Sequence, residues 1–261
     1  MFSKALGDEE GDSSTEQSSY YTLRNFSLDK RRMLYDRTHV FKVNGLYELP
    51  FGKGKTFFKN ANGFVDRVVG GWQLSGIFNK FSGQPLTFNA VNAFNAYAPG
   101  RGFTPDIFGS LPEGSVTRLG QGVTYFANLT QITDPQVAKL TTLGNLPALS
   151  TLKAINGPNG LLFANPAAGK LGSLGQGVMT GPGTFRLDVN LVKRIQITER
   201  ISMQIGATAQ NLTNTEQFGN PNTNINSTNF GKITSSAAFS NAGVGTTSPA
   251  RVLVLQGRVT F

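Results

Sequence analysis

The stretch that decides the fold is residues 185–197, FRLDVNLVKRIQI. Its odd-numbered positions are apolar at six of seven places, Lys193 being the exception, and its even-numbered positions are polar at five of six, Val192 being the exception. Side chains alternate between the two faces of a β-strand. This period of two therefore predicts a long strand with one apolar face and one polar face.

Similar alternation extends outward from this stretch in both directions. After the short joint 198–200, residues 201–213 alternate again, which predicts an antiparallel hairpin. Further strands are expected at the end of the chain and upstream, and the full set is 1–6, 38–49, 72–88, 185–197, 201–213 and 250–261. The sequence therefore predicts an all-β, antiparallel fold of about six strands.

The connections between these strands alternate in length. Long connections at 7–37, 89–184 and 214–249 fall at one end of the strands, and the shorter ones at 50–71 and 198–200 fall at the other. If the last residue is periplasmic, every long loop is extracellular, an asymmetry typical of outer-membrane barrels. The strands are also long enough to cross a bilayer obliquely. We thus expect a transmembrane β-barrel whose loop 89–184 is a functional or disordered surface loop, with a short helix near 134–143.

Composition excludes several other classes of protein. No apolar run reaches the roughly 18 residues of a membrane-spanning helix, and the chain has no cysteine for disulfides or zinc-thiolate sites. The net charge of +9 is spread along the chain without a groove-reading motif, so we expect no nucleic-acid partner. His39 is the only histidine, and we expect no enzyme, cofactor or metal site.

Two further stretches could suggest other interpretations. Residues 53–56, KGKT, imitate the end of a phosphate-binding loop, but Leu49 stands where the opening glycine is needed, so we expect a solvated turn. Residues 1–14 lack the order of a secretory signal, so either the chain is cytosolic or its true beginning is missing.

Several motifs, taken together and in order, resemble the C-terminal barrel of TonB-dependent receptors, in particular the Oar-like group common in Acidobacteria. They are DRTHVF at 36–41, YELPFGKG at 47–54, GGWQLSGI at 70–77, SGQP at 82–85, GPG at 181–183, NLTN at 211–214, FGNP at 218–221 and FGKIT at 230–234. The set spans nearly the whole chain and is specific as a set, whereas each motif alone is weak.

The resemblance implies a barrel of about 22 strands, closed by an N-terminal plug and energised through a contact with TonB. About six strands cannot close a barrel. We therefore interpret the chain as a C-terminal fragment from which the plug domain is absent, and which needs the missing N-terminal barrel as a partner. Its other expected partners are outer-membrane lipid, the outer-membrane assembly machinery and an unidentified solute, in the cell outer membrane of a Gram-negative-type bacterium.

Candidate residues follow from this interpretation. The terminal aromatic Phe261 resembles the signal that the assembly machinery recognises, and Tyr47, Phe51 and Trp72 are expected in an aromatic girdle at the membrane interface. Side chains on the polar strand faces are expected to point into the lumen, and these candidates are Lys42, Glu48, Arg186, Asp188, Asn190, Arg194 and Arg258.

Two other functions remain open at this point. An outer-membrane protein that displays or secretes proteins would share the barrel but would lack the plug and the TonB contact. A soluble, secreted β-sandwich that binds glycans through its long loops would refold in water without detergent, whereas a barrel fragment would aggregate because its apolar face and strand edges would be exposed.

Overall fold

The computed structural model describes residues 1–8, 25–91, 103–120, 122–139, 150–167, 169–237, 239–241, 244–247 and 250–261. The chain folds as two compact units, each built from three separate segments. Unit 1 comprises Met1–His39, Ser82–Gly183 and Phe218–Ser236, and unit 2 comprises Val40–Phe81, Thr184–Gln217 and Ala237–Phe261.

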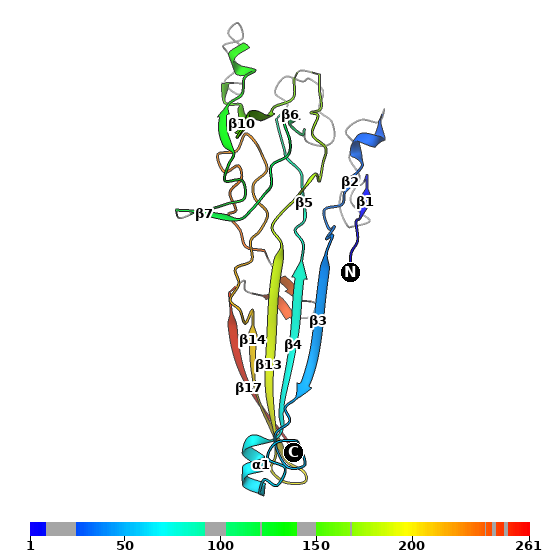
Figure 1. Cartoon of the computed structure of the whole chain (residues 1–261), viewed down its shortest axis with the longest axis vertical. Helices are drawn as coiled ribbons and strands as arrows, with labels where there is room; N and C mark the ends of the chain where they lie inside the picture. Colours follow the sequence, from blue (N-terminus) through cyan, green and yellow to red (C-terminus); the bar gives the residue numbers. More distant parts are fainter. Residues whose placement is uncertain are drawn as a thin grey trace. The chain divides into compact units, whose positions relative to one another are not determined.

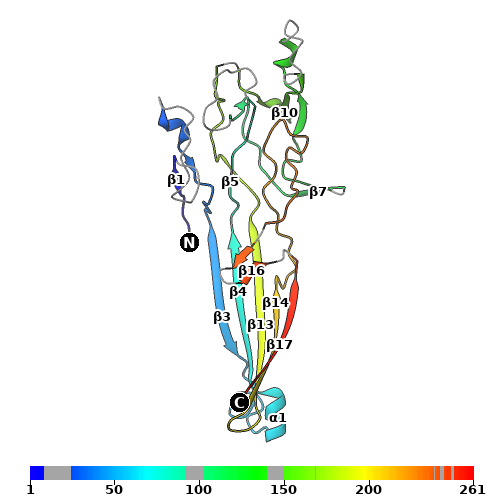
Figure 2. The same ribbon diagram turned by 180° about the vertical axis from the view of Figure 1, so that it is seen from behind.

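Unit 2 is built on one antiparallel sheet of five long strands, which lie side by side in Figures 1 and 2. Their spatial order is β17 (Val252–Thr260), β14 (Ser202–Gln210), β13 (Thr184–Gln196), β4 (Trp72–Phe81) and β3 (Val40–Glu48). Four of the strands lie within segments predicted from the sequence, β13 begins one residue before its predicted segment, and the all-β antiparallel class is confirmed. Within the described residues the sheet does not close on itself, since β17 and β3 are its edge strands.

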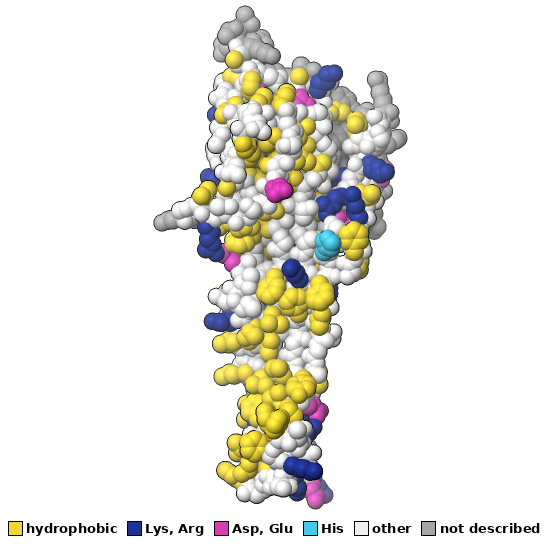
Figure 3. Space-filling view, viewed as in Figure 1, with side chains coloured by type: hydrophobic (Ala, Val, Ile, Leu, Met, Phe, Trp, Pro, Cys, Tyr) yellow, Lys and Arg dark blue, Asp and Glu magenta, His cyan; other side chains and the backbone are white. Residues whose placement is uncertain are grey.

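The register keeps the alternating pattern in phase across all five strands. Leu191 pairs with Leu74 and with Ala207, while Leu74 also pairs with Tyr47 and Ala207 with Leu255. Paired residues in a sheet point to the same side, so the apolar sets of the strands form one continuous apolar face. Hydrophobic side chains gather along the sheet in Figure 3, and Leu255 is 84% exposed. An apolar face of this extent needs a nonpolar environment.

The ends of the sheet differ in the connections they carry. Gln196 pairs with Ser202, and Ser202 with Thr260, so the short β13–β14 turn and Phe261 lie at one end. The β3–β4 connection, which contains helix α1 (Gly63–Val69), leaves the same end between Glu48 and Gln73. The longer connections leave the other end. The asymmetry expected from loop lengths therefore exists in this sheet.

The expected strand near 1–6 does not join the long sheet. Instead β1 (Leu6–Gly7) pairs with β2 (Arg31–Arg32), and Phe2 forms an isolated bridge with His39. The backbone of Ala5 is held locally, because its N–H donates to Asp36 Oδ1 at 2.9 Å. Pairing of this segment with residues 31–39 leaves the long sheet with five strands, one fewer than predicted.

The expected strand at 72–88 is also interrupted. It ends at Phe81, and β5 (Pro85–Leu86) pairs with β12 (Met179–Thr180) in a separate two-stranded sheet. Gly83 lies so close to the carbonyl oxygen of Gly181 that a Cβ atom has no room there. Pro85 lacks the N–H that a continuing central strand needs, which explains the break.

Unit 1 shows that the long loops are folded. Four strands form a sheet in the order β6 (Asp106–Ile107), β11 (Gly160–Ala164), β10 (Lys153–Gly157) and β9 (Thr130–Thr133), and β7 (Thr117–Leu119) forms a hairpin with β8 (Gly122–Thr124). A buried aromatic core joins them, with ring centroids of Phe88 and Phe163 at 4.8 Å and of Phe88 and Phe126 at 5.5 Å. Of the two alternatives for loop 89–184, a functional or a disordered surface loop, disorder is wrong for its described parts, and a functional role stays a prediction.

The remaining elements are short. The 3₁₀ helices η1 (Phe26–Asp29) and η2 (Val137–Lys139) belong to unit 1, and the hairpin β15 (Phe239–Asn241) with β16 (Val244–Thr247) belongs to unit 2. At the predicted helix 134–143 the structure has η2, while residues 140–149 lie outside the described residues. No helix in the described parts of the chain is long and apolar enough to span a membrane.

Candidate functional site

The polar face of the sheet carries a buried ion pair. Arg186 is 2% exposed, and its Nε donates to both carboxylate oxygens of Asp188, at 2.8 and 2.9 Å. Its Nη2 lies 3.4 Å from Gln210 Oε1 on the neighbouring strand, and the backbone N–H of Asn211 donates to Asp188 Oδ1 at 2.7 Å. Because these partners come from β13 and from the end of β14, the pair fixes these two strands to each other.

Asn190 continues this polar row along β13. Thr208 Oγ1 donates to Asn190 Oδ1 at 3.1 Å, and Ser75 Oγ donates to the Asn190 carbonyl at 3.5 Å. The middle of the polar face is hollowed into a trough of about 620 Å³, lined by Asp188, Asn190 and neighbouring residues of β3, β4 and β14. The trough gives this face space for water, a second protein segment or a solute.

The other predicted lumen residues share this face without forming one cluster. Lys42 and Arg186 are both paired with Asn79, whereas Arg194 and Arg258 are both paired with Gln204. Lys42 Nζ lies 5.3 Å from the centroid of the Phe81 ring, an ordinary cation–π distance. At the end of β3, Glu48 accepts a hydrogen bond from Lys55 at 3.0 Å. A lumen position for these residues remains a prediction.

The predicted girdle residues lie at the sheet end that carries the shorter connections. Tyr47 is exposed on β3, and the Trp72 indole N–H donates to the Val68 carbonyl at 3.3 Å. The Phe51 ring lies 5.6 Å from that of Phe57. Phe261 follows β17 at the same end and is almost fully exposed. The girdle and assembly roles stay predictions, consistent with these positions.

Lys193, a cation in the centre of the apolar face, has a structural explanation. Its ammonium donates to the Gly70 carbonyl at 2.6 Å and lies 4.9 Å from the centroid of the Trp72 ring. The carbonyl at the C-terminal cap of α1 and the indole face both favour a positive charge. Lys193 thus joins the β3–β4 connection to the centre of the sheet.

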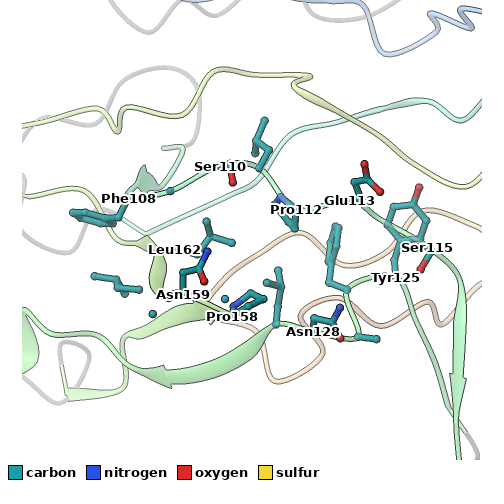
Figure 4. Close-up of a pocket in the computed structure, with 18 residues that line it drawn as sticks. Phe108, Ser110, Pro112, Glu113, Ser115, Tyr125, Asn128, Pro158, Asn159 and Leu162 are labelled. Carbon is teal, nitrogen blue, oxygen red and sulfur yellow. The ribbon is translucent and has the colours of Figure 1, made fainter.

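Unit 1 contains a pocket of about 310 Å³ that sequence reasoning missed. It is lined by three stretches, 108–115, 125–129 and 157–162, shown in Figure 4. Phe126 and Leu162 are buried there, while Glu113, Asn128 and Asn159 supply polar groups from more exposed positions. Within the described residues that line it there is no lysine, arginine or histidine. The lining thus favours a neutral or cationic ligand with an apolar part.

Tyr125 holds one side of this pocket in place. Its hydroxyl donates to the Thr180 carbonyl at 2.8 Å, and burial raises the pKa of the phenol. The only sequence signal near the pocket is the Pro-Asn-Gly turn at 158–160, where Gly160 has φ +104°. Such a turn predicts a hairpin but not a cavity, because the other two stretches come from distant parts of the chain.

A buried polar network supports the β-sheet of unit 1. Asp134 Oδ2 accepts hydrogen bonds from Asn165, from its backbone N–H at 2.9 Å and from its side chain at 2.8 Å, and Asp134 Oδ1 accepts from the Gln136 N–H at 2.9 Å. Asn226 donates to Asn165 Oδ1 at 2.7 Å and accepts from the Lys153 N–H at 2.8 Å. The carboxylate is thereby occupied by fixed donors, which marks a structural role.

Comparison with known proteins agrees with the geometry of the sheet. Residues 1–251 match a family model described as an outer membrane beta barrel domain. The chain belongs to this outer membrane beta barrel family. No curated protein and no solved structure matches it. The family membership supports an outer-membrane location in Gram-negative-type bacteria. Contact of the apolar face of the sheet with lipid stays a prediction.

Proposed function

We propose that this outer membrane beta barrel chain forms part of the wall and the extracellular segments of a TonB-energised receptor that imports a solute. The observation that carries the proposal is that one chain combines a two-faced sheet with long connections that are folded. The sheet has an apolar face and a polar face with a fixed ion pair, and the long connections form a folded unit with its own pocket. A wall with a folded outer unit fits capture of a solute followed by its passage inward.

The five strands of the sheet in the described residues cannot make a pore by themselves, since the smallest transmembrane barrels have about eight strands. Further strands must pair with β3 and β17, because unpaired strand edges are not tolerated in hydrocarbon. The proposal assigns these strands, together with a plug and a contact with TonB, to a part of the receptor outside this chain. Lipid and the assembly machinery are its other proposed partners, and we propose no catalytic role.

The solute proposed for the outer unit is neutral or cationic, with an apolar portion. This follows from the pocket lining, which combines buried Phe126 and Leu162 with amide groups and the Glu113 carboxylate. At about 310 Å³ the pocket lies at the lower end of the range for small-molecule sites.

Uptake in the bacterium that carries the gene tests this function. Uptake of iron chelates, cobalamin, oligosaccharides and short peptides would be compared between cells with and without the gene, before and after collapse of the proton gradient. We expect uptake of one class of solute to be lost when the gene is deleted, and also when the proton gradient is collapsed in cells that carry the gene. An Asn159→Trp variant, which fills the pocket, should lower that uptake at an unchanged outer-membrane level, whereas Leu119→Trp, outside the lining, should not.

Display or secretion of proteins is the alternative within the same family. It predicts normal uptake in the deletion strain together with loss of a surface or secreted protein. The soluble β-sandwich alternative does not fit membership of an outer-membrane family, nor the exposed apolar face of the sheet.

A further inference from the structure

The β3–β4 connection, residues 50–71, carries more apolar surface than a turn in water requires. Helix α1 begins after Asn62, whose side chain accepts a hydrogen bond from the Val65 N–H at 2.9 Å. Phe64, which is 77% exposed, and Val68 lie four residues apart on one side of this helix. In a turn surrounded by water, these exposed apolar side chains would bury no surface and would add nothing to stability.

The backbone at Phe58 is strained. Its φ is +61°, in the left-handed region that phenylalanine rarely adopts, and its ring is 57% exposed. A left-handed conformation costs roughly 1 kcal/mol or more for a residue with a side chain. The connection thus holds an aromatic ring outward at a cost, next to Phe57, which is also exposed.

The same connection is rich in positive charge. Residues 50–71 contain four basic residues and one acidic residue, a net charge of +3. Lys53, Lys59 and Arg67 are exposed, whereas the one acidic group, Asp66, accepts the backbone N–H of Lys53 at 2.5 Å. Exposed aromatic rings interspersed with lysine and arginine are the composition of segments that lie in the headgroup region of a membrane.

The apolar surface of the connection continues that of the sheet. A hollow of about 440 Å³ is lined only by apolar side chains, which come from the connection, from Leu49 directly after β3, from the first residue of β4, and from Leu191 in β13. Figures 1 and 2 show α1 next to the end of the sheet. The ammonium of Lys193 on the Gly70 carbonyl fastens the connection to the wall at this point.

We propose that the β3–β4 connection is an interfacial anchor that inserts Phe58, Phe64 and Val68 among phospholipid chains while its basic side chains bind anionic headgroups. It lies on the periplasmic side in the orientation proposed above. The anchor depends on the sheet being in a membrane and not on solute import. The solvated turn expected at residues 53–56 is present in the structure as an exposed turn, and the residues proposed to insert follow it in the chain.

The test uses single labelling sites, which the absence of cysteine makes unambiguous. The complete receptor, with Val68→Cys as its single cysteine and Trp72 as its single tryptophan, would be labelled with a polarity-sensitive dye and reconstituted into phosphatidylcholine vesicles with and without about 20% phosphatidylglycerol. Glu199→Cys, in the exposed turn at the same sheet end, is the matched control. Trp72, the only tryptophan, reports insertion of the wall through quenching by brominated lipids.

We expect the dye at residue 68 to be quenched by brominated lipid and to be at least fivefold less accessible to an aqueous quencher than the dye at residue 199. Protection should be greater with phosphatidylglycerol and should fall to the control level in a Phe58→Ser/Phe64→Ser background.

Equal aqueous accessibility at 68 and 199 with Trp72 quenched by lipid would overturn the anchor and leave the barrel intact. Protection at 68 without quenching by lipid would also overturn it, because protein would then cover the helix. Absence of lipid quenching at Trp72 would overturn both the anchor and the membrane placement of the wall.

Discussion

The ion pair between Arg186 and Asp188 leads to a quantitative prediction. Arg186→Met keeps the length of the side chain but removes the charge, so that the Asp188 carboxylate loses two hydrogen bonds. Breaking a buried pair costs about 3–5 kcal/mol. Asp188 keeps the Asn211 N–H and has a 14% exposed side chain, so we expect the lower end, about 3 kcal/mol.

The assay is urea unfolding of the complete receptor in detergent micelles, with Trp72 as its single tryptophan and its fluorescence as the readout. With a slope of about 2 kcal/mol per molar urea, the midpoint should fall by about 1.5 M. Arg194→Met is the control, since Arg194 lies on the same strand face but is exposed. A double-mutant cycle with Asp188→Asn should give a coupling energy of about 2 kcal/mol. Equal midpoints for both arginine variants and zero coupling would refute the reasoning from burial.

Four other predictions follow from single sites. Asp134→Ala should destabilise unit 1 by about 3 kcal/mol, because buried donors lose their acceptor, and hydrogen exchange in β9 and β10 would report it. Burial raises the pKa of the Tyr125 phenol above its value of about 10 in the unfolded chain. The contribution of Tyr125 to stability is therefore complete below about pH 10 and is lost as the pH rises through the pKa of the folded state. Tyr125→Phe should flatten this alkaline loss of stability, measured in urea titrations at several pH values. Gly71→Ala should cost more than about 2 kcal/mol, because φ is +72° and a Cβ would collide with the Arg194 carbonyl, whereas Gly45→Ala, with open space, should be tolerated in the same urea titration. Deletion of Phe261 from the complete receptor should lower its yield in outer-membrane fractions, and unchanged insertion would count against a role in assembly.

The long sheet could be predicted from sequence because its information is local. In residues 185–197, odd and even positions point to opposite faces of the sheet, so the sequence alone assigns each side chain to a face. One strand of this kind also constrains the register of its neighbours. The two exceptions in that stretch needed the structure. The Lys193 ammonium donates a hydrogen bond to the carbonyl of Gly70, which lies 123 positions away in the sequence. Val192 is buried and is paired with Gln73 on the neighbouring strand.

Unit 1 could not be predicted because its contacts join distant parts of the chain and its strands are short. β6 and β12 have two residues each, too few for a period to be seen. The core joins Phe88, Phe163 and Ile225, and the polar network joins Asp134, Asn165 and Asn226. Asparagine and glycine between such elements are typical of turns, and nothing in their local pattern reveals that a buried core or a pocket lies among them.

The construction of unit 1 from three segments has a consequence for the order of folding. Its core is incomplete until residues 218–236 supply Ile225 and Ile233, and these follow β13 and β14 in the chain. During synthesis and membrane insertion, core residues such as Phe88 and Phe163 therefore keep part of their apolar surface uncovered. They are covered only after the β13–β14 hairpin and the segment 218–236 that follows it have been added. We expect unit 1 to be the last part to become resistant to protease, and its transplantation as one contiguous segment into another barrel to fail.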